Sequence, residues 1–356
     1  MTSHAEPSLT FSEDELLGSR KYDEPLIAGG VRCHGGFDED GRYHSPRTLH
    51  RTPAISAWQD QLLRSGHDVI EISRALMPPQ YPNVEQAKLL LRHGVRDPMV
   101  RSLTIISIVE GFGAVIRDVR VPELAELIVE PIDGTALSHL RHGLFEAHAR
   151  DEAGYEDEGG HKQMWEAARD LALEHPKIPG DVLMRLMGRR SRAPKRERPF
   201  PQLDEKLERM LAMMAQVLVI EVFAEGTFQW GIDVLSDPEV SAEPQAAGDM
   251  VRYIQSDESP HVEYLRTALS EVRARTLRTV DGKQIAGCKV VDGLLHDMLH
   301  NLTRNRPREQ REDVRESMIA AMQDVANPTS LEEEYESLAS AWTAPAQTGF
   351  EPSSAA

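Results

Sequence analysis

Cysteine, aromatic residues, basic charge and long apolar runs are all scarce in this chain of 356 residues. Its two cysteines, Cys33 and Cys288, belong to no CxxC motif, so neither a disulfide framework nor a thiolate zinc site is expected. The formal net charge of -18 argues against a nucleic acid or an anionic membrane as partner, because both require clustered basic residues. No stretch approaches the roughly 18–20 apolar residues that span a bilayer, and the N-terminus lacks the features of a signal peptide. We therefore predict a cytoplasmic protein.

Helical periodicity dominates the chain from about residue 54. Strand signals are few and aromatic residues make up only 5%, which favours an all-α fold. A helix is expected after Pro98, and a break near Gly154 is expected in the helical stretch at 136–174. The other expected helices lie near residues 54–65, 84–93, 202–235, 248–275, 290–302 and 309–325.

Three regions are expected from composition. Residues 1–53 show no sustained helical period, and their glycine-rich segments predict turns and loops in an extended arm. Residues 54–335 are expected to form the helical domain, and residues 336–356 a largely disordered tail. The basic run from Arg185 to Arg198 predicts an exposed loop, with a docking patch for an acidic partner as the alternative.

Two Glu-x-x-His pairs are the main chemical signal, Glu158 with His161 and Glu258 with His261. Residues three apart share one face of a helix, so a carboxylate and an imidazole can bind one metal ion together. The motif is short, and a lone histidine is more often structural. The interpretation therefore depends on the surrounding residues.

Glu225 strengthens the interpretation of the two pairs as a metal site, because this residue lies in the most apolar helical segment of the chain. It belongs to a stripe at helical spacing that comprises Met214, Leu218, Glu221, Glu225, Phe228 and Ile232. Ionised carboxylates on an apolar stripe cost several kcal/mol unless they are paired or bind a cation. A buried salt bridge is the alternative. A hairpin turning near Ser236 would bring Glu225 level with Glu258.

The segments EGTFQW (225–230) and DESPHVEYL (257–265) resemble the second half of ferritin-like di-iron carboxylate proteins. The resemblance implies a four-helix bundle, here with extra N-terminal and C-terminal helices, over roughly residues 100–275. It also implies metal ligation by Glu158, His161, Glu225, Glu258 and His261. The first-helix ligand is expected to be Glu110, with Glu146 as the alternative, and Glu221 is a possible further ligand.

Several residues depart from the pattern or compete with it. Pro260 removes a helix N–H inside the second pair, and Gly159 and Gly160 weaken the helix of the first pair. His296 and His300 lie four apart but lack the glutamate of HExxH, so they are expected to lie away from the site. The resemblance suggests Met214 and Phe228 as walls of an apolar substrate pocket, with plain core packing as the alternative.

The function predicted from the resemblance is an O₂-dependent oxidoreductase with two iron ions, or manganese or a mixed pair in their place. Its partners would be a small organic substrate, O₂ and an electron-donor protein, and the chain would form a homodimer. The alternatives are a ferritin-like protein that handles iron and a helical interaction protein without metal.

Overall fold

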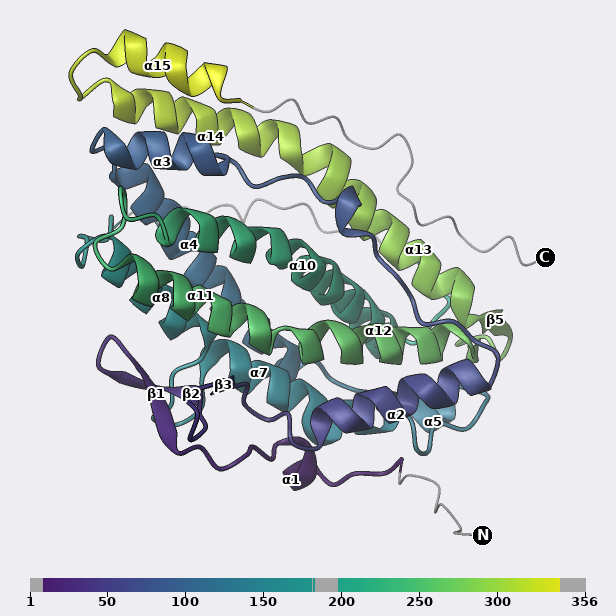
Figure 1. The fold of residues 1–356 in the computed structure, drawn as a ribbon. Helices are drawn as coiled ribbons and strands as arrows, with labels where there is room; N and C mark the ends of the chain where they lie inside the picture. The colour runs from purple at the N-terminus through teal and green to yellow at the C-terminus, as the bar shows by residue number, and fades with distance from the viewer. Residues whose placement is uncertain (1–8, 181, 183–197, 340–356) are drawn as a thin grey trace.

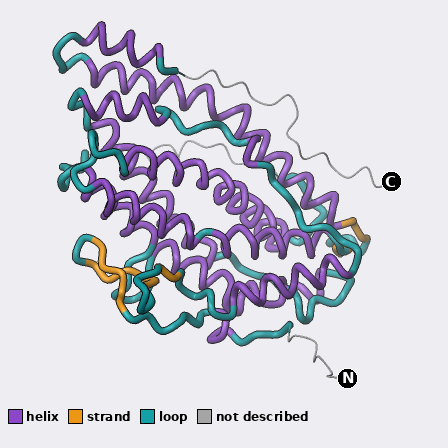
Figure 2. Tube along the Cα trace, in the orientation of Figure 1, coloured by secondary structure: helices purple, strands orange, loops and turns teal. Residues whose placement is uncertain are grey.

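The computed structural model describes residues 9–180, 182 and 198–339. Most of this part of the chain is helical, as predicted, and its strands are few and short (Figure 2). The longer helices are α2 (Arg51–Arg64), α3 (Val84–Arg92), α4 (Asp97–Gly113), α7 (Phe145–Ala153), α8 (His161–Ala172), α10 (Glu205–Leu235), α11 (Pro244–Asp257), α12 (Ser259–Arg273), α13 (Gly287–His300), α14 (Arg306–Met322) and α15 (Pro328–Ser337). Three one-turn helices are α1 (Glu13–Leu16), α5 (Leu124–Leu127) and α6 (Ala136–His139).

The 31-residue helix α10 runs through the middle of the molecule (Figure 1). Its N-terminus is capped by Asp204, whose side chain accepts hydrogen bonds from the backbone N–H groups of Lys206 and Leu207. Helix α10 packs on α11 and α12, α8 packs on α11, and α4 packs on α7 and α8. Helix α10 is therefore surrounded by elements that come from both halves of the chain.

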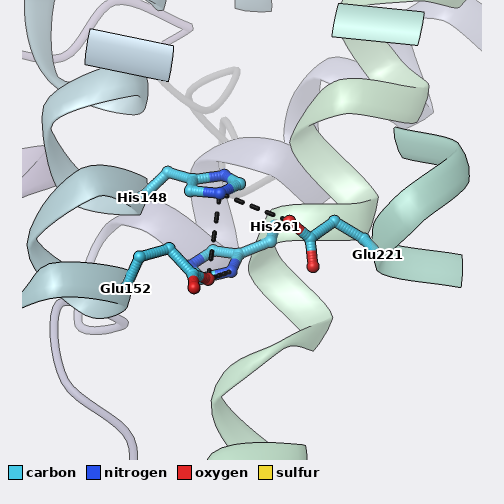
Figure 3. A group of neighbouring side chains, drawn as sticks. All are labelled: His148, Glu152, Glu221 and His261. Carbon is cyan, nitrogen blue, oxygen red and sulfur yellow. Dashed lines mark ion pairs between the residues drawn. The ribbon is translucent and has the colours of Figure 1, made fainter. Parts of the chain in front are cut away.

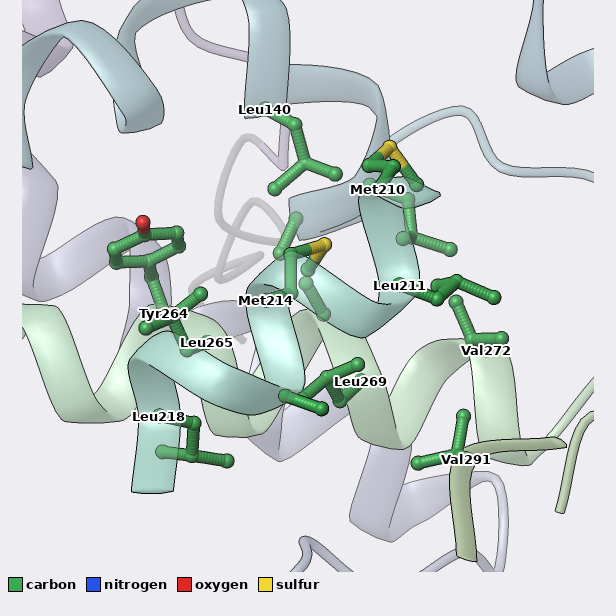
Figure 4. Packing of buried hydrophobic residues seen from close by; sticks show 14 of the residues in the cluster. Leu140, Met210, Leu211, Met214, Leu218, Tyr264, Leu265, Leu269, Val272 and Val291 are labelled. Atoms are coloured by element: carbon green, nitrogen blue, oxygen red, sulfur yellow. The ribbon is translucent and has the colours of Figure 1, made fainter. Parts of the chain in front are cut away.

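Much of the apolar core lies along α10. Met210 and Met214 are fully buried there and pack among leucine and valine side chains from the neighbouring helices (Figure 4). Further along α10, Phe228 is also fully buried, and its ring stacks on that of Trp165 from α8. These two parts of α10 belong to separate apolar clusters, and the residues between them include Glu221.

The predicted break in the 136–174 stretch is wider than a bend. Helix α7 ends at Ala153, and α8 begins only at His161. Gly154 has a φ of +82°, and an added Cβ there would lie 2.3 Å from the carbonyl oxygen of Glu158. Only glycine fits such a turn. The sequence Glu158-x-x-His161 is therefore not helical along its length, because Glu158 lies in the loop.

Pro260 lies at the start of a helix, where the chain turns between two helices, and not inside one. Helix α11 ends at Asp257, and α12 begins at Ser259 with the proline in its first turn. A missing N–H costs nothing at that position, because the first helical N–H groups have no partner within the helix. Glu258 is the junction residue, and the backbone N–H of His261 donates to its carbonyl oxygen at 2.9 Å.

The N-terminal arm contains a small antiparallel sheet, so the prediction of turns and loops was wrong for its strand residues, although the segments between the strands are turns. Its strands are β1 (Glu24–Ala28), β2 (Val31–Phe37) and β3 (Tyr43–His44), in the order β1-β2-β3. Strand β2 has four consecutive buried residues instead of an alternating pattern, which removes the usual sequence signal of a strand. A second hairpin joins β4 (Thr276–Arg278) to β5 (Gln284–Ala286).

Contrary to the sequence expectation, two helical stretches, Asp97–Asp118 and Glu205–Leu235, are long and apolar enough to cross a membrane by length and composition alone. The core helix of a soluble protein passes the same test, so this finding leaves the cytoplasmic location a prediction. Most of the basic run at 185–198 and the tail from residue 340 lie outside the described residues.

Candidate metal centre

A group of buried histidines and glutamates lies where α7, α8, α10 and α12 meet. His148 and Glu152 come from α7, His161 from α8, Glu221 from α10, and His261 from α12, with Glu258 just before it. Figure 3 shows four of these side chains converging from three helices. Glu110 of α4 is buried beside them, where its charge interacts with those of Glu152 and Glu258.

Two histidines point the same ring atom at the same carboxylates. The Nδ1 atom of His161 lies 2.9 Å from Glu258 Oε1 and 3.3 Å from Glu152 Oε1. The Nδ1 atom of His261 lies 2.8 Å from Glu258 Oε2 and 3.2 Å from Glu152 Oε1. Glu152 and Glu258 are therefore shared between both imidazoles, one from each half of the chain.

His148 adds a third imidazole, which the sequence interpretation missed. Its ring stacks on that of His261 with the centroids 4.0 Å apart, and its Nδ1 lies 3.2 Å from the hydroxyl of Tyr264. The opposite ring atom, Nε2, lies 3.4 Å from Glu221 Oε1 and 3.9 Å from Glu152 Oε1. Burial, followed by the neighbouring charge of His261, holds the pKa of His148 well below its ordinary value. The neutral form is the one in which an imidazole can bind a metal ion.

Several buried ligand atoms of this group contact one another as ion pairs but have no hydrogen bond. They are His148 Nε2, His161 Nδ1, Glu152 Oε1 and Glu258 Oε1. Buried polar atoms are normally hydrogen-bonded, and each exception calls for an explanation such as a bound ion. The ligand atoms of Glu152, His161, Glu258 and His261 all lie within 4.8 Å of one another. The buried group could therefore hold a metal ion.

The pKa values in this group show how strongly its charges interact. Burial raises the pKa of Glu110 and of Glu221 well above the ordinary value, and the charges of Glu152 and Glu258 raise both further. Burial alone would lower the pKa of His161 and His261, but the Glu258 carboxylate beside them raises both. Protons on these side chains offset the mutual repulsion of the carboxylates, a role that a bound cation can also take.

An aspartate precedes each shared glutamate and contacts the histidine of the other half. Asp151 Oδ2 lies 2.9 Å from His261 Nε2, and Asp257 Oδ2 lies 3.5 Å from His161 Nε2. A carboxylate on the far ring nitrogen fixes the tautomer and orientation of a metal-binding histidine. Asp151 therefore directs Nδ1 of His261 towards the shared glutamates through a hydrogen bond, and Asp257 makes the corresponding ion-pair contact with His161.

The N-terminal arm supplies the partners of these aspartates. Arg47 and Arg51 both bind Asp151, with the Arg51 contact at 2.7 Å. Tyr43 donates a hydrogen bond of 2.8 Å to Asp257, which also lies 3.2 Å from His34 Nε2. Arg47 reaches Nδ1 of His34 at 3.2 Å, so it links the two aspartate networks. The arm is thus part of the centre, a role that its composition did not indicate.

Glu158 and Glu225 were predicted as ligands, but the structure places both outside the group. Glu158 lies in the loop before α8 and pairs with Arg32 at 3.2 Å, and its side chain is 34% exposed. Glu225 pairs with Arg74 at 3.0 Å and accepts a hydrogen bond from Gln255. Glu146, the alternative first-helix ligand, pairs with Arg150 at 2.7 Å. Each of these carboxylates already has a cationic partner near the surface.

Helix register explains why Glu221 replaces Glu225. The sequence count assumed that the second arm of the hairpin begins at Gly248, whereas α11 begins at Pro244. Fourteen residues separate Glu221 from the end of α10 at Leu235, and fourteen separate Pro244 from Glu258. Two residues that lie equally far from the loop of an antiparallel helical hairpin are level with each other, so Glu221 lies level with Glu258. One turn of helix therefore separates the predicted residue from the observed one.

Glu152 replaces Glu158 for a related reason. It lies in the last turn of α7, and the glycine loop folds back so that His161 meets it. The dipeptide Asp-Glu did not distinguish the two candidates, because it occurs at 151–152 and at 157–158 as well as at 257–258. His148, however, lies four residues before Glu152, on the same face of the helix.

The remaining sequence candidates lie elsewhere in the molecule. Met214 and Phe228 are fully buried in the apolar core, and neither lines the two cavities that lie beside α10. His296 and His300 lie near each other on α13, with ring centroids 6.3 Å apart. Neither belongs to a group of potential metal ligands within the described residues.

No family model, curated protein or solved structure matches this chain. The resemblance to ferritin-like proteins therefore has no support beyond the residues themselves.

Proposed function

We propose that the buried group binds two divalent metal ions and that the protein is an O₂-dependent oxidoreductase. The observation that carries this proposal is the convergence of buried ligand atoms from α7, α8, α12 and the α11–α12 junction to within 4.8 Å of one another. Glu110, Glu152 and His161 would supply one half of the site. Glu221, Glu258 and His261 would supply the other, a division typical of ferritin-like di-iron proteins.

The donor set favours iron or manganese over zinc. Structural zinc sites have four ligands and catalytic ones three, usually cysteine or histidine. Here four glutamates and two histidines are available, with His148 as a third imidazole. Mixed carboxylate and imidazole donors suit iron and manganese. Four glutamate charges also balance two divalent cations.

Bound iron would supply electrons for the reduction of O₂, and the chain would control the surroundings of that chemistry. Asp151 and Asp257 hold the imidazoles in a fixed orientation. Buried leucines and methionines on α10 exclude water from one side of the group. Such an enzyme also requires an electron donor, which we expect to be a separate protein.

Oxygen consumption tests this proposal. Protein loaded with ferrous iron under anaerobic conditions should consume O₂ and develop a new optical absorption when air is admitted. Glu221→Gln should abolish both responses, and Glu225→Gln, one turn further along α10, should retain them. Iron that binds without any response to O₂ would favour an iron-handling protein instead. An equal response from both variants would contradict the proposed ligands.

A further inference from the structure

Two adjoining cavities lie beside α10, next to the segment that follows α2. The first, of about 330 Å³, is lined by the buried carboxylates Glu221 and Glu258 and by the exposed residues Glu71 and Arg74. It therefore extends from the surface to the candidate metal centre. The second, of about 480 Å³, continues along α10 between Met77, Pro79, Val222, Thr227 and Trp230. The cavities share Arg74, Val222 and Glu225, and we call them together the α10 groove.

Gly226 supports a ligand in this groove. It lies in the interior of α10 and lines the second cavity. Glycine weakens a helix interior relative to alanine, so its presence there calls for a reason. Gly231, one turn later, has such a reason, because an added Cβ would lie 2.7 Å from the ring of Trp165. At Gly226 an added Cβ would meet nothing within 4 Å. The missing side chain thus leaves space in the groove that no other described part of the chain fills.

The groove is acidic even when the proposed metal ligands are left out. Its remaining charged residues are Glu71, Glu225, Asp233, Glu263, Arg74 and Arg266. Both arginines are already paired: Arg74 with Glu225, and Arg266 with Glu263 at 2.8 Å and with Glu71 at 3.2 Å. A carboxylate or phosphate would find no unpaired cation among these wall residues. A positively charged group would find one wall carboxylate, Asp233, that pairs with no cation among the described residues and accepts a hydrogen bond from Gln229 at 2.8 Å.

We propose that the α10 groove binds a small molecule with an apolar body and a protonated amino group. The apolar body would lie beside Gly226 and Trp230 in the second cavity. The amino group would lie near Asp233, which lines the same cavity. As a statement about a substrate the inference rests on the proposed function, because the groove leads to Glu221 and Glu258. As a statement about binding it does not depend on metal.

Calorimetric titration with three probes of equal chain length tests the proposal: n-hexylamine, n-hexanol and n-hexanoate. The full-length chain is titrated as purified and again after metal removal with a chelator. We expect n-hexylamine to bind at least about tenfold more tightly than n-hexanoate in both forms, a difference of about 1.4 kcal/mol. Asp233→Asn should reduce this preference, and Glu158→Gln, remote from the groove, should leave it unchanged.

Two substitutions at one position test the location. Gly226→Phe should fill the second cavity and weaken n-hexylamine binding by at least about tenfold, whereas Gly226→Ala should change it little. Circular dichroism checks that both variants fold. Equal or tighter binding of n-hexanoate, or unchanged binding in a folded Gly226→Phe variant, would overturn the proposal. If the amine binds but the protein takes up no metal, the proposed amine binding in the groove is supported and the proposed oxidoreductase function is wrong.

Discussion

Asp151 and His261 are 110 residues apart in the chain, yet Oδ2 of the aspartate lies 2.9 Å from Nε2 of the imidazole. Both side chains are completely buried. Burial would raise the pKa of Asp151, but Arg47 and Arg51 hold it well below the ordinary value, so this carboxyl stays ionised. An ionised partner on Nε2 fixes His261 with Nδ1 directed at Glu152 and Glu258.

Asp151→Asn should therefore weaken metal binding without removing any ligand. Loss of an outer partner of a metal-binding histidine typically costs about 10–100-fold in affinity. The variant also leaves two buried arginines without their carboxylate, which should destabilise the fold by about 3–5 kcal/mol. Anaerobic ferrous titration and urea unfolding measure the two effects separately. Asp170→Asn, in the ion pair with Arg169 on α8, is the matched control. Unchanged affinity in a folded Asp151→Asn variant would show that the aspartate does not position His261.

Two matched pairs of glutamates test the ligand assignment. Glu152→Gln and Glu221→Gln should each lower the metal content, because each removes an anionic donor from the buried group. Glu158→Gln and Glu225→Gln should keep the wild-type content, because these carboxylates pair with Arg32 and Arg74 outside it. Metal analysis after ferrous loading decides between the structure-based and the sequence-based ligand assignments. Metal loss in the second pair, with retention in the first, would restore the sequence-based assignment.

Gly113, the last residue of α4, makes room for one of the proposed ligands. A Cβ added there would lie 2.5 Å from Cγ of Glu152. Gly113→Ala should therefore displace Glu152 and lower metal affinity by at least about tenfold, the smaller cost seen when the surroundings of a ligand are disturbed. Gly226→Ala is the control, because its added methyl group meets open space. Equal metal affinities in the two variants would argue against Glu152 as a ligand.

Glu271 should give the protein a pH-dependent stability that is independent of metal. Burial raises its pKa to about 7, although the backbone N–H groups of Ala136 and Leu137 donate to its carboxylate. The folded protein then holds this proton more tightly than the unfolded chain, whose ordinary value is 4.5. The bound proton therefore stabilises the folded state. Its contribution to the free energy of unfolding is complete below pH 4.5 and is lost as the pH rises through about 7, a change of about 3 kcal/mol.

Urea unfolding at pH 5 and pH 8 measures this effect for the wild type and for Glu271→Gln. The wild type should lose more stability than the variant between the two pH values, because glutamine does not ionise. Parallel losses in the two proteins would contradict the raised pKa of Glu271.

Local sequence patterns were sufficient to predict most of the helices. The periodic apolar residues of α10, the proline in the first turn of α4 and the glycines after α3 and α7 all act within a few residues of the chain. The sheet of the arm was missed because β2 is buried on both faces near its middle and shows no alternation. Its burial depends on contacts with residues more than a hundred positions away, such as Gly159.

The candidate centre was predictable in chemistry but only partly in its residues. His161, Glu258, His261 and Glu110 converge because each lies in or beside a helix whose position the sequence indicated. The choice between Glu221 and Glu225 required the start of α11 to within one helical turn. The choice between Glu152 and Glu158 required the path of a glycine loop. Arg47 and His34 could not be connected to the centre at all, because only tertiary packing brings the arm to it.

The central claim is that one chain binds two metal ions between its halves, and anaerobic titration with ferrous iron tests it most directly. The account predicts saturation at about two ions per chain, the content of a paired-metal site. Glu152→Gln and Glu258→Gln should each fall clearly below that value, because both residues contact the two central histidines. A stoichiometry near zero in the folded wild-type protein would contradict the claim.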